Sequence, residues 1–96
     1  MADLTKLKSL LSRINNISNV EKTDDAYYQA NEIATELCEE LPDNKNIQLD
    51  IKILKKYDLK GSDKSKRSVI EEFKEISMRD VFRVITMIEN NHLNQH

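Results

Sequence analysis

Apolar residues recur at intervals of three and four positions along most of this chain. The first such series comprises Leu4, Leu7, Leu11 and Ile14, and the second comprises Ala26, Ala30, Ile33, Leu37 and Leu41. This spacing places apolar side chains on one face of a helix. We therefore predict helices over about residues 3–18 and 23–41. Asp3 is the expected N-cap of the first helix. Thr23, Asp24 and Asp25 are expected to supply the N-cap and the first-turn acids of the second, with the cap at Thr23.

The segment 47–54 fits two patterns. Ile47, Leu49, Ile51 and Ile53 alternate with polar residues, as in a half-buried strand, whereas Ile47, Ile51 and Leu54 fit helical spacing. We favour a helix, because a lone strand is not stable and the chain offers no better partner strand. Strand and helix both remain open from the sequence.

The C-terminal third contains either one helix or two. Gly61 and Ser62 break the pattern, and apolar residues then continue at helical spacing from about 65 to 91. Ser77 and Asp80 have the form of a capping box ahead of a new apolar run, which would divide this segment. Between 81 and 88 apolar residues cover most of the helix circumference, so this helix is either central or meets another chain.

These elements predict the fold class. The chain has 96 residues with one glycine and one proline, which indicates helices joined by short turns. We expect an all-α fold, a compact bundle of four to five short helices with antiparallel neighbours. It forms a single domain over 1–96, with 92–96 frayed at the end.

Composition points to a cytoplasmic protein. No apolar run approaches the ~20 residues that cross a bilayer, so no membrane partner is expected. Cys38 is the single cysteine, as expected of a thiol in a reducing compartment. The richness in Lys, Asn and Ile suggests a bacterial or phage genome rich in A and T.

Charge is strongly segregated along the chain. Residues 21–43 hold eight acidic residues against one lysine, and residues 44–67 hold eight basic residues against three acidic ones. Either the two segments pack together and neutralise each other, or each meets a partner. The candidate interface residues are Tyr28, Glu32, Glu36, Glu39, Val84 and Met87. The candidate phosphate-contacting residues are Lys55, Lys56, Lys64, Lys66 and Arg67.

Candidate chemistry is sparse. His92 and His96 stand four apart, but no acid or cysteine near them completes a four-ligand metal site. Cys38 has glutamates as its nearest charged neighbours, which disfavour a reactive thiolate. The chain contains none of the glycine-rich phosphate loops, Cys-x-x-Cys pairs or nucleophile elbows that mark common active sites. We therefore expect no catalytic residues, no cofactor and no metal, and do not expect an enzyme.

The leading functional hypothesis is a small helical protein–protein interaction module, such as an inhibitor, immunity or adaptor protein. It rests on the compact helical pattern, the missing chemistry and the segregated charge. One alternative is a nucleic-acid-binding regulator that uses the basic segment 52–67. Another is a self-association domain, a homodimer in which the C-terminal helices pair about a two-fold axis.

Overall fold

The computed structural model describes residues 3–94, with side chains through residue 91, and this part of the chain is almost entirely helical. Its elements are α1 (Leu4–Asn16), η1 (Ile17–Asn19), α2 (Thr23–Glu40), α3 (Lys45–Lys52), η2 (Ile53–Lys56) and α4 (Asp63–Asn94). No strand occurs among the described residues. The predicted all-α bundle is confirmed, and segment 47–54 is helical, as favoured from its sequence.

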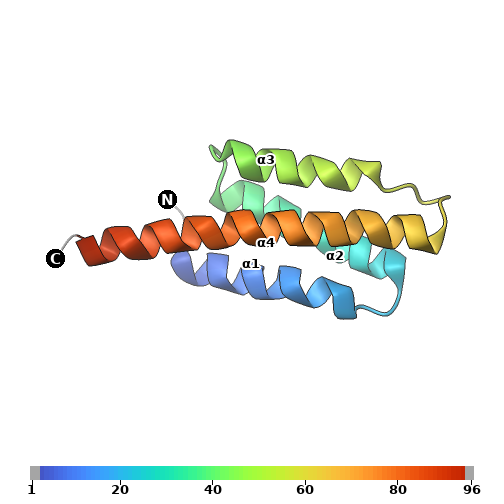
Figure 1. The fold of residues 1–96 in the computed structure, drawn as a ribbon, viewed down its shortest axis with the longest axis horizontal. Helices are drawn as coiled ribbons and strands as arrows, with labels where there is room; N and C mark the ends of the chain where they lie inside the picture. Colours follow the sequence, from blue (N-terminus) through green and yellow to red (C-terminus); the bar gives the residue numbers. More distant parts are fainter. Residues whose placement is uncertain (1–2, 95–96) are drawn as a thin grey trace.

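The long helix α4 organises the fold. In Figure 1 it runs the length of the molecule, with α1 and α3 on either side of it and α2 behind. It packs against all three of the other α-helices. Consecutive α-helices run antiparallel, as predicted. Within the apolar run of residues 81–88, Val81 and Ile85 are buried, whereas Phe82 and Met87 remain exposed, so the central position of α4 explains only part of this run.

The core lies between α4 and the other helices. Phe73 of α4 is the largest fully buried side chain in it. The other fully buried apolar side chains come from every α-helix: Leu7, Leu10, Ile14, Ala26, Ala30, Leu37, Ile47, Ile70 and Val81. Each of these positions follows the helical spacing seen in the sequence, so the pattern alone identifies the core-facing stripes.

Polar residues define most helix boundaries. The Asp3 carboxylate accepts hydrogen bonds from the backbone N–H groups of Thr5 and Lys6, and Asn44 caps α3 by accepting from Ile47 N at 3.1 Å. The helix α2 ends just before Pro42, as expected from the restriction on a residue that precedes proline. The predicted cap at Thr23 is wrong, because Lys22 occupies the N-cap position.

The segment after Gly61 is one uninterrupted helix, so the predicted capping box at Ser77 and Asp80 is wrong. Ser77 is fully buried between Phe73 and Val81 on the core-facing stripe, and its hydroxyl donates to the backbone oxygen of Phe73 one turn earlier. An N-cap needs a break in the helical backbone, and none occurs here. The Ser77–Asp80 motif does not start a new helix, because the buried residues before and after it lie on one continuous face of α4.

Candidate interaction surfaces

Five large apolar side chains are more than half exposed among the residues that the structure describes. They are Tyr28 on α2, Leu49 on α3, Leu59 in the loop before α4, and Phe82 and Met87 on α4. Singly exposed apolar side chains are ordinary on protein surfaces. Their neighbours therefore decide which of them belong to a candidate interface.

Met87 is exposed because α4 outruns its neighbour. Asp80 of α4 lies against Asp50 of α3, and Val84 and Met87 follow Asp80 on the same helical stripe, four and seven residues later. Because α3 runs antiparallel to α4, the end of α3 nearest this stripe is its first residue, Lys45. The helix α3 does not extend beyond Lys45 and therefore does not cover the stripe. Figure 1 shows α4 continuing beyond α3 at its C-terminal end. Val84 is half-buried and Met87 is 60% exposed. We call Val84 and Met87 the C-terminal stripe.

The four candidate interface residues on α2 are divided by the structure. Tyr28, Glu32 and Glu39 are exposed. Glu36 is turned toward α1, where its carboxylate pairs with Lys6 at 2.7 Å and Arg13 at 2.6 Å. These two cations, through their hydrogen bonds to the carboxylate, lower the pKa of Glu36. Glu36 therefore joins α1 to α2, an internal role that the sequence did not indicate.

The candidate phosphate contacts do not form one basic patch. Arg67 donates from Nη2 to the backbone oxygens of Val20 and Glu21 at 2.6 Å, and Lys66 pairs with Asp24 at 3.0 Å. Lys56 pairs with Glu72 at 3.1 Å. Only Lys55 and Lys64 are exposed and form no ion pair with another described residue.

Lys66 and Arg67 belong to a polar network that fastens the start of α4 to the start of α2. The Thr23 hydroxyl donates to Asp63 and accepts from Arg67 Nε at 2.9 Å. The Tyr57 hydroxyl donates to Asp24 at 2.6 Å, and the Tyr57 ring stacks on Tyr27 with centroids 3.9 Å apart. Burial and the carboxylate partner raise the pKa of Tyr57 above its usual range. Through Lys66 and Asp24 the basic and acidic segments meet, which is one of the two alternatives that the charge pattern left open. The sequence did not indicate the other contacts of the network, because their members lie about 40 residues apart.

A second buried polar contact was also missed. Asp50 of α3 and Asp80 of α4 are both buried, and one carboxylate oxygen of Asp50, Oδ2, has no hydrogen-bond partner. Burial, and next the neighbouring Asp80, raise the pKa of Asp50 to about 7. Arg79 and Arg83 lie 3.7 and 3.9 Å from Asp80 Oδ1. The only signal in the sequence was an acidic residue at a core-facing position on each helix.

The structure assembles no group of three or more His, Cys, Asp and Glu side chains suited to a metal ion within its described part. We did not expect His92 and His96 to form a metal site, and both side chains lie outside the part of the chain that the structure describes. Cys38 is half-buried, with its Sγ 3.7 Å from Gln48 Oε1. Within the described residues, no helix is both long and apolar enough to span a bilayer.

Comparison with known proteins gave no match to a protein-family model, a curated protein or a solved structure.

Proposed function

We propose that this chain is a small protein-interaction module that presents the C-terminal stripe of α4 to another protein. The observation that supports the proposal is the continuation of α4 past α3. Met87 is therefore 60% exposed, although it lies on the same stripe of α4 that contacts α3 at Asp80, seven residues earlier. A partner that covers the exposed 60% of Met87 would remove from water apolar surface worth roughly 1–2 kcal/mol.

The stripe is suited to one partner surface, whereas the other exposed apolar residue of α4 is not part of it. Val84 and Met87 are three residues apart and lie on adjacent parts of one face. Phe82 lies about 140° around the helix from Met87, at about 100° per residue. Exposed polar residues, Arg83 and Thr86 among them, lie between the two positions. A partner bound at Met87 therefore leaves Phe82 uncovered.

The nucleic-acid alternative receives less support. Three of its five candidate residues are held by carboxylates or backbone oxygens of the chain itself, as described above. A protein that neutralises phosphates needs its cations available together, and the affinity then falls steeply with salt. The whole chain also has a formal net charge of −2, which opposes association with a polyanion.

The test compares three forms of the tagged chain as bait in host lysate, at low and at high salt, with bound proteins identified by mass spectrometry and nucleic acid by staining. The forms are wild type, M87E, and T86E as the matched control. Thr86 is exposed on the same turn but lies about 100° from Met87. Size-exclusion chromatography of the three forms without lysate shows whether the partner is a second copy.

We expect a protein that is retained by wild type and T86E at both salt concentrations and lost with M87E. Loss of an oligomer of the pure chain with M87E would also support the stripe and would name the partner as a second copy. Equal retention by all three forms would place the contact elsewhere. Recovery of nucleic acid alone, at low salt alone, would overturn the proposal in favour of the basic segment.

A further inference from the structure

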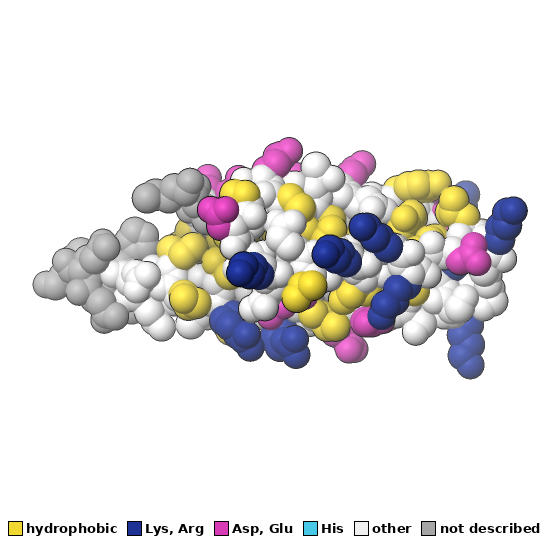
Figure 2. Space-filling model, turned by 90° about the horizontal axis from the view of Figure 1, so that it is seen from above, with side chains coloured by type: hydrophobic (Ala, Val, Ile, Leu, Met, Phe, Trp, Pro, Cys, Tyr) yellow, Lys and Arg dark blue, Asp and Glu magenta, His cyan; other side chains and the backbone are white. Residues whose placement is uncertain are grey.

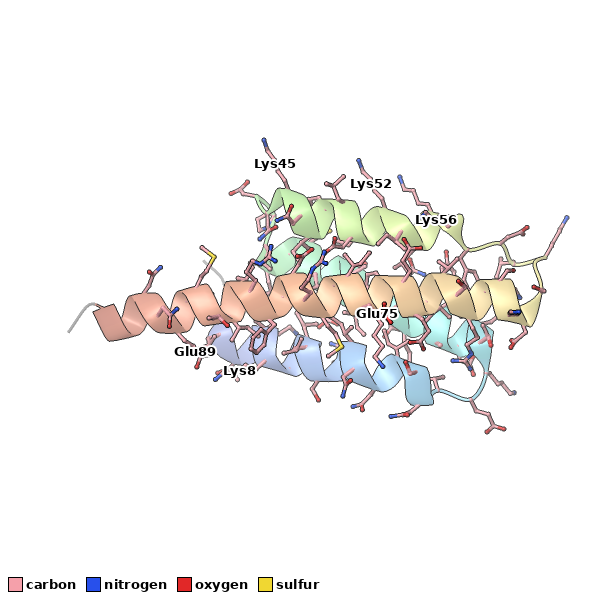
Figure 3. The ribbon with its side chains drawn as sticks, viewed as in Figure 1. Lys8, Lys45, Lys52, Lys56, Glu75 and Glu89 are labelled. Atoms are coloured by element: carbon pink, nitrogen blue, oxygen red, sulfur yellow. The ribbon has the colours of Figure 1, made fainter. Side chains whose placement is uncertain are left out.

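The outer side of α3 carries two lysines around an exposed leucine. We call Lys45, Leu49 and Lys52 the α3 lysine face; they stand four and then three residues apart and share one side of the helix. Leu49 is 59% exposed, and neither lysine forms an ion pair with another described residue. Figure 3 shows both lysines pointing away from the bundle. The face is therefore basic at its ends and apolar at its centre.

The chain also carries the complementary pattern. We call Asp25, Tyr28 and Glu32 on α2 the α2 acidic face; they stand three and then four residues apart, and all are exposed. Tyr28 is 55% exposed. Neither Asp25 nor Glu32 pairs with a cation of the described part, in contrast to Asp24, which pairs with Lys66, and Glu36, which pairs with Lys6 and Arg13.

The two faces match in order and in length when the helices run antiparallel. Seven residues rise about 10 Å along a helix, which separates the two charges by the same distance on each face. In the antiparallel direction Asp25 meets Lys52, Tyr28 meets Leu49 and Glu32 meets Lys45. A parallel alignment brings the charges together but leaves Tyr28 one residue away from Leu49.

This contact cannot form within one chain. The helices α2 and α3 already pack against each other, and one contact between them is that of Cys38 with Gln48, neither of which belongs to the two faces. In Figure 2, which views the α3 side, basic side chains lie across the surface and several carboxylates line the upper edge, toward α2. All six residues of the two faces are exposed on one molecule, so each face is accessible to another.

We propose that the α3 lysine face binds the α2 acidic face of a second copy of this chain. This proposal goes beyond the interaction module above and uses a different surface. The two faces are unlike, so each bound copy still offers one free face, and repetition builds a ring or an open chain. Exposed ion pairs each contribute little and are screened by salt. The association is therefore weak, depends on concentration and declines with ionic strength.

The experiment is sedimentation velocity over a range of protein concentrations at low salt. It uses wild type, the variant D25K/E32K, the variant K45E/K52E, and an equimolar mixture of the two variants. The double variant K60E/K64E, which changes two exposed lysines outside both faces, is the matched control. All substituted side chains are exposed, and circular dichroism verifies that each variant is folded.

We expect wild type and K60E/K64E to associate, and each face variant to associate roughly tenfold or more weakly. The mixture should associate again, because the native lysine face of D25K/E32K meets the native acidic face of K45E/K52E, and the two charge-reversed faces are complementary to each other as well. A monomeric wild type at every concentration, or an unchanged oligomer in either face variant, would overturn the proposal. So would a mixture that stays monomeric. M87E should associate like wild type here, so this proposal and that for the C-terminal stripe fail separately.

Discussion

Asp50 of α3 and Asp80 of α4 bury two carboxyl groups against each other in the α3–α4 contact. Burial, and next the neighbouring Asp80, disfavour the charged form of Asp50 and raise its pKa to about 7. Arg79 and Arg83 approach the outer side of Asp80 at 3.7 and 3.9 Å, and both are largely exposed. They compensate only part of the charge.

This pair predicts that stability falls as pH rises. The pKa of Asp50 is raised from 3.8 to about 7 in the folded chain, so the native state holds a proton that the unfolded state has released between these values. The free energy of unfolding should decline from about pH 4 to pH 7, by at most about 4 kcal/mol, and level off above pH 7. Urea denaturation at a series of pH values measures this slope.

The variant D50N should remove most of that decline. Its amide can donate to Asp80 at any pH, so we expect it to be more stable than wild type at pH 8. Asp43, an exposed residue in the turn before α3, provides the matched control D43N, which should keep the wild-type slope. A slope that survives in D50N would assign the pH dependence to other groups.

Two phenylalanines of α4 should differ sharply in their effect on stability. Phe73 is fully buried, so F73A leaves a cavity and should cost about 3–5 kcal/mol. Phe82 is 61% exposed, so F82A should change the free energy of unfolding by less than about 1 kcal/mol. Urea denaturation of both variants tests the placement of α4. Comparable losses at the two positions would contradict the helix orientation described above.

Ser77 should tolerate removal of its hydroxyl. Its hydroxyl donates only to backbone oxygens of its own helix, and alanine favours a helix interior. The free energy of unfolding of S77A should therefore lie within about 0.5 kcal/mol of that of wild type. Asn44 is the contrasting case, because it caps α3, and N44A should cost about 1 kcal/mol. A loss at S77A as large as that at N44A would restore the capping-box interpretation.

The Tyr57 hydroxyl should contribute to the network that joins α2 and α4. Y57F keeps the stacking on Tyr27 but loses the bond to Asp24, and should cost about 0.5–1.5 kcal/mol. Y28F alters an exposed tyrosine one residue from Tyr27 and serves as the control. Thermal unfolding followed by circular dichroism distinguishes the two variants, and equal midpoints would deny the hydroxyl a stabilising role.

The helices and most of the core follow from the pattern of residues along the chain. Leu7, Ile33 and Phe73 are buried as their three- and four-residue spacing requires, because a helix turns its periodic apolar positions toward one side wherever it packs. Local chemistry also placed the cap at Asp3 and the stop before Pro42. These features depend on neighbours within a few residues, and such neighbours are visible along the chain.

Which polar residues are available to a partner depends on how the helices pack in three dimensions. Glu36 and Arg67 resembled surface charges in the sequence, yet they bind α1 and the start of α2, respectively, across 23 to 47 positions. Asp50 and Asp80 come together because α3 and α4 pack antiparallel in one register, and Met87 remains exposed because α3 begins where it does. A long-range contact depends on the packing of whole helices, which no local pattern of residues encodes.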